Sequence, residues 1–128
     1  MNNLIPQISI YFNSHPSILS VYLLGSTARG TRRIDSDIDL GIMPFDGFVV
    51  SSRELLKMTG DLGYEFGYDF DLGLVQSNNL VYAKEAIWTG ERIHSKNELT
   101  TLWKENTLTS MYFNFQVERK VVIDAYRI

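Results

Sequence analysis

GSTARGTRRIDSDIDL, residues 25–40, is the stretch that decides the fold. It begins with a glycine and a serine that follow an apolar run, and it contains Asp37 and Asp39 with one residue between them. Successive side chains on a strand point to opposite faces, so both carboxylates project from one face, roughly 7 Å apart at their Cα atoms. Two like charges this close repel each other unless a cation lies between them. The stretch therefore indicates a site for a positively charged ligand.

A second pair of acids recurs further along the chain. Asp69 and Asp71 alternate with Phe70, Leu72 and Leu74, which again indicates a strand with acids on one face and apolar residues on the other. If the two strands are neighbours, Asp37, Asp39 and one acid of the second pair form a three-carboxylate cluster. Such clusters suit Mg²⁺, which binds through carboxylates and substrate phosphates. With two metals, the cluster would clamp both oxygens of an in-line phosphoryl displacement.

The Gly25-Ser26 turn fits the same chemistry. Glycine lets the backbone approach a ligand closely, and the free N–H groups at the start of a following helix attract anions. The Ser26 hydroxyl can donate to a phosphate oxygen. A lone Gly-Ser pair is usually only a turn, and a lone Asp-x-Asp is usually a solvated face. Their joint occurrence, repeated on a further strand, favours a site for a triphosphate and a metal.

Helix and strand patterns alternate along the rest of the chain. We predict an α/β (α+β) fold with a central mixed sheet of about four strands flanked by helices, and a long C-terminal helix. The 128 residues fit one domain, 1–128. The predicted strands are residues 18–24, the run with Ile38, Leu40 and Ile42, residues 70–74, and a short edge strand at 92–94.

Five helices are predicted before, between and after these strands. They span residues 3–13, a brief turn of helix from Gly25-Ser26 to about Gly30, a helix after Ser51 closed by Gly60 and Gly63, a helix from Asn78 or Asn79 to Gly90, and a final helix to about Tyr126. Ser51 with Glu54, and Ser95 with Glu98, have the spacing of capping boxes. His15 and His94 are isolated, and we expect them at surface or edge positions.

The motif residues resemble the nucleotidyltransferase signature of the DNA polymerase beta superfamily. That signature is Gly-Ser, ten residues, then Asp-x-Asp, and the chain has it from Gly25 to Asp39. The fuller form typical of minimal nucleotidyltransferases is G-S-x-A-R-G, five residues, then S-D-x-D-L. Its matches are Gly25, Ser26, Ala28, Arg29, Gly30, Ser36, Asp37, Asp39 and Leu40.

This resemblance implies roles for the motif residues. Asp37, Asp39 and Asp71 would be catalytic and would hold Mg²⁺ or Mn²⁺, with Asp69 as the rival of Asp71 for the third place. Gly25 and Ser26 would bind the phosphates of ATP. Arg29 and Ser36 are further candidates for nucleotide binding, although Arg29 could instead pair with an acid and Ser36 could cap the strand.

The resemblance also implies a partner. Small stand-alone members look like the antitoxin half of HEPN/MNT toxin–antitoxin pairs, in which AMP is transferred to a tyrosine hydroxyl of a HEPN-type RNase. Two alternatives stay open. One is a small-molecule nucleotidyltransferase of the aminoglycoside kind, which would normally need extra helices, or a dimer, to enclose its acceptor. The other is a non-catalytic module that blocks a toxin by occupancy, against which the intact acids argue.

The composition of the chain argues against several other classes of function. The chain has no cysteine, so thiolate chemistry is excluded. Its net charge is −3 and its basic patch is short (Arg29, Arg32 and Arg33), so we expect no direct nucleic-acid binding. The start lacks a basic n-region and no apolar run reaches the ~20 residues of a membrane span, which predicts a cytoplasmic protein without membrane contact.

Apolar residues cover more than one stripe of the final helix. A helix on the surface of a small domain buries only a limited arc. The excess predicts a contact with the partner or with another copy of the chain, giving a hetero- or homo-oligomer. The alternative is that this helix runs through the core.

Overall fold

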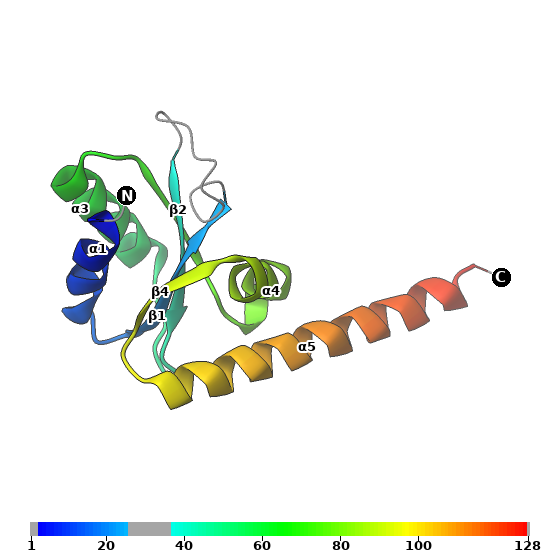
Figure 1. The fold of residues 1–128 in the computed structure, drawn as a ribbon. Coiled ribbons are helices and arrows are strands. Elements are labelled where there is room, and N and C mark those ends of the chain that lie inside the picture. The colour runs from blue at the N-terminus through cyan, green and yellow to red at the C-terminus, as the bar shows by residue number, and fades with distance from the viewer. Residues whose placement is uncertain (1–2, 26–36, 128) are drawn as a thin grey trace.

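A four-stranded mixed sheet forms the centre of the computed structural model, which describes residues 3–25 and 37–127 (Figure 1). The spatial order is β3-β2-β1-β4. β1 is antiparallel to both of its neighbours, whereas β2 and β3 run parallel. The predicted mixed sheet is confirmed. The strands are β1 (Ile18–Leu24), β2 (Ile38–Pro44), β3 (Phe70–Leu74) and β4 (Glu91–Ser95).

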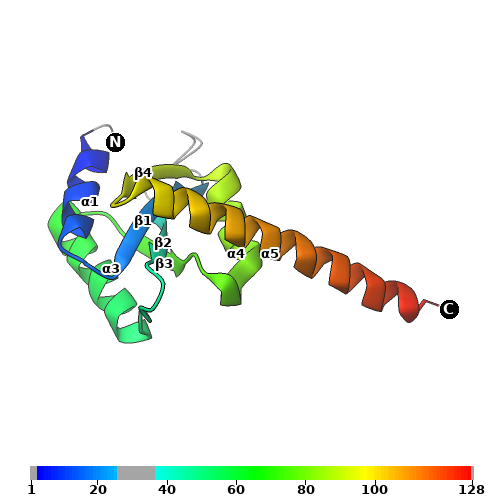
Figure 2. The same ribbon diagram turned by 90° about the horizontal axis from the view of Figure 1, so that it is seen from below.

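Helices cover both faces of this sheet (Figures 1 and 2). One face packs on α1 and α3, and the other on α4 and α5. A short 3₁₀ turn, Ser77–Asn79, precedes α4. The helices are α1 (Leu4–Asn13), α3 (Ser52–Phe66), α4 (Leu80–Thr89) and α5 (Glu98–Ala125).

Alternation along β2 decides which residues face which layer. Ile38, Leu40 and Ile42 belong to the core beneath α1 and α3. Asp39 and Gly41 therefore face the α4 side of the sheet. A Cβ atom at Gly41 would lie 3.0 Å from the Val75 side chain and 3.4 Å from that of Ala86, so this face packs closely on α4.

The end of α3 differs from the prediction. The capping box is confirmed at its start, where Ser51 Oγ accepts a hydrogen bond from the Glu54 N–H at 3.1 Å. However, the helix does not close at Gly60 and Gly63. It continues to Gly67, whose φ of +75° forms the left-handed cap. A glycine inside a helix costs only about 1 kcal/mol relative to alanine, and the burial of Leu62 offsets this.

The start of α5 also corrects the prediction. The N-cap is Asn97, whose side-chain oxygen accepts from the Thr100 N–H at 3.0 Å. Ser95 instead lies in β4, and its hydroxyl is 2.9 Å from that of Thr101. The capping box of Ser95 with Glu98 is therefore wrong, while the predicted end of the helix near Tyr126 agrees with Ala125.

His94 is buried rather than exposed. It lies on the edge strand β4, as expected, but α1 covers it and leaves 6% of its surface exposed. Its Nδ1 is 2.8 Å from Ser9 Oγ, and its ring lies 6.3 Å from that of Phe12. Burial, and next the charge of Lys96, lower the pKa of His94 below its ordinary value.

α5 extends well beyond the rest of the fold (Figures 1 and 2). Its buried residues are Thr101 and Leu108, both in its first half. The second half lies outside the core and carries exposed apolar side chains, so the interpretation that the whole helix runs through the core is wrong. No helix in the described part of the chain combines the length and apolar character that crossing a membrane requires.

Candidate active site

Two acids meet where β2 and β3 begin. These strands are parallel neighbours, and their register pairs Asp39 with Asp71. Side chains at paired positions of adjacent strands project from the same face. The sequence left open whether the two acidic strands are neighbours. The structure shows that they are, because Ile38 pairs with Phe70 and Leu40 with Leu72 on either side of the acids.

Gly25 lies against the same carboxylates. It follows directly on β1, whose last residue, Leu24, pairs with Asp39. Its φ is +63°, in the left-handed region that glycine adopts without strain. A Cβ atom at this position would lie 2.7 Å from Asp39 Oδ2. The backbone can approach the acids this closely only because Gly25 has no side chain.

The electrostatics of the acids favour a cation. Burial raises the pKa of Asp39, and the nearby charges of Asp71 and then Asp37 raise it further. Carboxylate oxygens are the donors that hard cations such as Mg²⁺ prefer, and a cation would relieve this repulsion. The residues present therefore fit the predicted metal.

The three predicted ligands are not equally placed. Asp37 is exposed and lies just before β2, while Asp39 and Asp71 are paired across the strands. Within residues 3–25 and 37–127, no group of three or more His, Cys, Asp or Glu side chains is arranged closely enough to hold a metal ion. The three-carboxylate metal site thus stays a prediction.

Asp71 is better placed than Asp69 for the third carboxylate. Asp71 pairs with Asp39, contributes to its raised pKa and lines the pocket beside it. Asp69 lies before β3, and its backbone carbonyl accepts a hydrogen bond from the Ile38 N–H at 2.8 Å. The geometry favours Asp71, although its chemical role is still a prediction.

A pocket of about 270 Å³ opens beside these acids. Its lining residues are Leu24, Gly25, Asp39, Asp71, Gly73, Tyr82 and Glu85. A Cβ atom at Gly73 would lie 2.4 Å from the Tyr82 ring, so this strand position accommodates the ring only as glycine. The Tyr82 hydroxyl donates to the Leu40 carbonyl at 3.4 Å, and burial and both acids raise its pKa to about 12.

Tyr82 and Glu85 were missed by sequence reasoning. They lie three residues apart on α4, a spacing that places both on one helix face. Gly73, two residues after Asp71, is the one signal that a bulky group approaches β3 here. Which side chain approaches β3 depends on how α4 packs on the sheet. That packing cannot be read from a local sequence pattern.

The other predicted nucleotide-binding residues cannot be placed. Ser26, Arg29 and Ser36 lie outside the described residues, as does the predicted brief helix between them. Their roles stay predictions.

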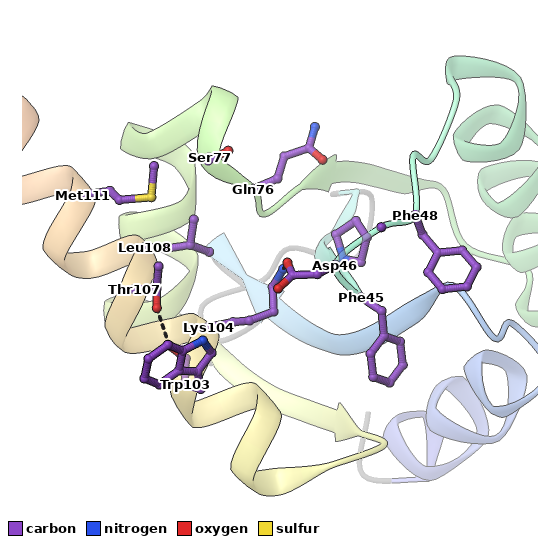
Figure 3. Close-up of a pocket in the computed structure, with 12 residues that line it drawn as sticks. Phe45, Asp46, Phe48, Gln76, Ser77, Trp103, Lys104, Thr107, Leu108 and Met111 are labelled. Carbon is purple, nitrogen blue, oxygen red and sulfur yellow. Dashed lines mark hydrogen bonds and ion pairs between the residues drawn. The ribbon is translucent and has the colours of Figure 1, made fainter.

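A larger hollow, of about 320 Å³, lies at the opposite end of the sheet. It is bounded by the turn after β2, the segment after β3 and α5 (Figure 3). Aromatic side chains such as Phe45 and Trp103 line it, and Lys104 Nζ lies 2.5 Å from Asp46 Oδ1. This hollow lacks the paired acids, so we place the active site at the smaller pocket.

A mixed sheet with paired acids beside a glycine turn is the arrangement of a nucleotidyltransferase. The sequence profile described as "Polymerase beta, Nucleotidyltransferase" matches residues 6–99. The match covers both acidic strands and the motif at residues 25–40, which ends in the first of them. The chain therefore belongs to the polymerase beta nucleotidyltransferase family.

Individual proteins and solved structures are also similar to this chain. The chain is 26% identical over 117 residues to protein adenylyltransferase MntA of Shewanella oneidensis, covering 91% of this chain and 82% of the relative. A solved toxin–antitoxin structure with AMP-PNP has a TM-score of 0.77 at 22% identity and covers both chains fully. A structure of tri-AMPylated Shewanella oneidensis HEPN toxin in complex with MNT antitoxin has a TM-score of 0.74 at 20% identity, with full coverage of both chains. These structures support the fold.

Proposed function

We propose that this chain is a metal-dependent nucleotidyltransferase that transfers AMP from ATP to a tyrosine hydroxyl of a HEPN-type toxin, and so acts as its antitoxin. The observation that carries the proposal is the pairing of Asp39 with Asp71 directly beside Gly25. Burial and the neighbouring carboxylates raise the pKa of Asp39, and a perturbed carboxyl of this kind in a pocket is typical of a functional site. Family membership supports the reaction class.

The reaction balances with these groups. The acceptor oxygen attacks the α-phosphorus of ATP, a new O–P bond forms, and the bond to the bridging oxygen breaks to release pyrophosphate. Asp71 is the candidate that accepts the proton of the attacking hydroxyl. Gly25 and Ser26 would hold the β- and γ-phosphates. Positioning and charge stabilisation should account for most of the rate.

Asp37, Asp39 and Asp71 would hold Mg²⁺ or Mn²⁺. The bound metal would supply positive charge to neutralise the phosphate oxygens as the leaving group departs. Without a metal, the negative carboxylates would repel the negative triphosphate. These residues can therefore bind ATP only when a cation balances their charge. The structure supports this through the raised pKa of Asp39.

The partner assignment rests on the relatives. The curated relative is a protein adenylyltransferase, and a structural relative is an MNT antitoxin bound to an AMPylated HEPN toxin. We infer the same class of partner for this chain, and a cytoplasmic location where an RNase toxin would meet its substrate. The exposed apolar surface of α5 is compatible with a protein partner.

The test uses the full chain, the protein encoded next to it, Mg²⁺ and ATP labelled at the α-phosphate. We expect label on a tyrosine of the neighbouring protein, loss of its RNase activity, and no label with Asp37→Asn or Asp39→Asn. An unlabelled partner would reject the proposal.

Two further outcomes identify the alternatives. If the Asp37→Asn, Asp39→Asn double variant still neutralises the toxin fully, the chain acts by occupancy. If label passes to an aminoglycoside hydroxyl with no protein acceptor present, the chain modifies small molecules instead.

A further inference from the structure

Two glycines let α4 approach the sheet directly behind the paired acids (Figure 1). Gly41 and Gly73 pair with each other on β2 and β3. Each lies two residues beyond an acid, Asp39 or Asp71, and so faces the same side of the sheet as that acid. A Cβ atom at Gly73 would lie 2.4 Å from the Tyr82 hydroxyl oxygen, so this hydroxyl lies directly on the strand that carries Asp71.

The Tyr82 hydroxyl is only weakly bonded in this position. Its hydrogen bond to the Leu40 carbonyl is 3.4 Å long, whereas O–H···O bonds are ordinarily about 2.5–3.0 Å long. Tyr22 shows what a tyrosine next to a carboxylate does elsewhere in this fold, because its hydroxyl donates to Glu105 Oε2 at 2.6 Å. The Tyr82 hydroxyl is therefore free to donate to a better acceptor.

The acids beside Tyr82 are suitable acceptors. Carboxylates that ligate a metal are themselves hydrogen-bonded by surrounding groups, which fix their orientation. Among the described residues that line the pocket of the acids, Tyr82 alone has a side-chain hydrogen-bond donor at neutral pH. Burial, and then the charges of Asp71 and Asp39, raise the pKa of Tyr82 to about 12. Of the two acids, Asp71 therefore acts more strongly on this hydroxyl.

We propose that Tyr82 is a positioning residue for AMP transfer and that its hydroxyl donates a hydrogen bond to the Asp71 carboxylate. This inference rests on the proposed function, in which Asp71 shares the metal and accepts the proton of the attacking hydroxyl. The bond occupies one carboxylate oxygen and leaves the other for the metal and the acceptor. It also fixes the direction of the carboxylate, because the Tyr82 ring is held between α4 and Gly73.

Tyr82→Phe removes the hydroxyl and keeps the ring on Gly73. At saturating Mg²⁺, kcat for AMP transfer should fall about tenfold, since a hydrogen-bond partner of a metal ligand is worth about 10–100-fold in activity or metal affinity. KM for ATP should be unchanged, as expected for an interaction that matters only in the transition state. Initial rates with labelled ATP measure both quantities.

A double-mutant cycle shows whether Tyr82 acts through Asp71. The Asp71 side chain is exposed, so Asp71→Ala removes the acceptor without opening a cavity in the core. In this background, Tyr82→Phe should lower the rate no further, because the group that the hydroxyl positions is already gone. A hydroxyl that only supported the fold would cause the same loss in both backgrounds.

Metal binding gives a readout that needs no activity. Mn²⁺ is titrated into the full chain without ATP and followed by electron paramagnetic resonance. Tyr82→Phe should weaken Mn²⁺ binding about tenfold, and this effect should vanish in the Asp71→Ala background. If the wild type transfers no AMP, the proposed function fails, while the Mn²⁺ cycle still tests the link between Tyr82 and Asp71.

Tyr22→Phe controls for a loss of stability. It removes a short hydrogen bond to Glu105 on α5, so it should lower the urea midpoint more than Tyr82→Phe does. Its kcat should nevertheless stay near that of the wild type, because Tyr22 does not line the pocket of the acids.

Four results would each overturn the proposal. Tyr82→Phe could transfer AMP as fast as an active wild type, or bind Mn²⁺ as tightly as the wild type does. Its losses could persist in full in the Asp71→Ala background, which would show that the hydroxyl does not act through that carboxylate. Tyr22→Phe could lose as much kcat as Tyr82→Phe, in which case activity follows stability and not the position of Asp71.

Discussion

The two ends of the β2–β3 pair are built in opposite ways. Where the strands begin, Asp39 lies beside Asp71 and Gly25, and burial and then the neighbouring carboxylates raise its pKa. Where they end, Asp46 faces the ammonium of Lys104 at 2.5 Å beside a hollow with aromatic walls. Charge is therefore concentrated at one end and neutralised at the other.

This difference separates function from stability. Repulsion between acids destabilises the folded chain, so a cluster that persists indicates a ligand that compensates for it. An ion pair with one exposed partner contributes little to either activity or stability. Substitutions of the charged side chains at the acidic end should thus change activity more than stability, and substitutions of the charged side chains at the other end should change neither strongly.

The largest effect should come from the third carboxylate. Asp71→Asn should reduce AMP transfer by about 10²–10³-fold, because it removes a charge at the reacting centre. Its stability should stay the same or rise as the repulsion with Asp39 falls. Initial rates with labelled ATP and thermal unfolding measure both.

Asp69→Asn is the matched control, with the same change two residues away. It should alter the rate by less than about threefold, within the scatter of surface substitutions. Equal losses for both variants, or a larger loss for Asp69→Asn, would reverse the assignment of the third carboxylate.

A pair of glycines compares the two ends directly. Gly25 and Gly47 both have positive φ, +63° and +86°. An added Cβ would strain the backbone at both, at about 1–2 kcal/mol each. At Gly25 it would also displace Asp39 Oδ2, while at Gly47 it would meet nothing within 4 Å.

Gly25→Ala should therefore lower AMP transfer about tenfold or more, since small displacements of reacting groups have large effects. Gly47→Ala should retain the wild-type rate with a similar loss of stability. Kinetics and urea unfolding on the same samples distinguish these effects. If both variants lose activity equally, backbone strain and not the carboxylate is responsible.

Sequence periodicity predicted most elements of the fold because the buried residues recur with the period of each element. β1, β2 and β3 were recognised from apolar runs or alternation, and Ser51 from its capping spacing. Local sequence patterns gave wrong predictions where tertiary packing determines the structure. α3 continues through two glycines because Leu62 is buried, and His94 is covered by a helix that lies far away in the sequence.

The site was predictable only in part, for the same reason. Acids and glycine were visible in the sequence, but the choice between Asp69 and Asp71 depends on the register of β2 with β3. Tyr82 reaches the acids through the packing of α4 on Gly73. Register and helix packing are properties of the assembled sheet, so they could not be read from one segment.

A smaller effect should appear in the pH dependence of stability. Burial lowers the pKa of His94 below its ordinary value of 6.5. The unfolded chain therefore binds the proton more readily than the folded chain does. The contribution of His94 is complete above pH 6.5 and is lost as the pH falls towards the folded-state pKa, by at most about 1.4 kcal/mol per pH unit.

Urea unfolding at about pH 7.5 and about pH 5.5 measures this loss. His94→Asn should be less stable at the higher pH, because it fills the site beside Ser9 less well, and should lose less on acidification than the wild type. An unchanged pH dependence in the variant would assign the acid sensitivity to other groups.

The smallest effect should come from the ion pair at the neutralised end. The Asp46 side chain is 84% exposed, whereas that of Lys104 is 14% exposed. Water solvates Asp46 well, so Asp46→Asn should change the free energy of unfolding by less than about 1 kcal/mol, and less still at high salt. AMP transfer should be unaffected, because the pair lies at the other end of the strands from Asp39. A substantial loss of activity would show that the two ends are coupled through β2, and the separation of stability from function argued from them would fail.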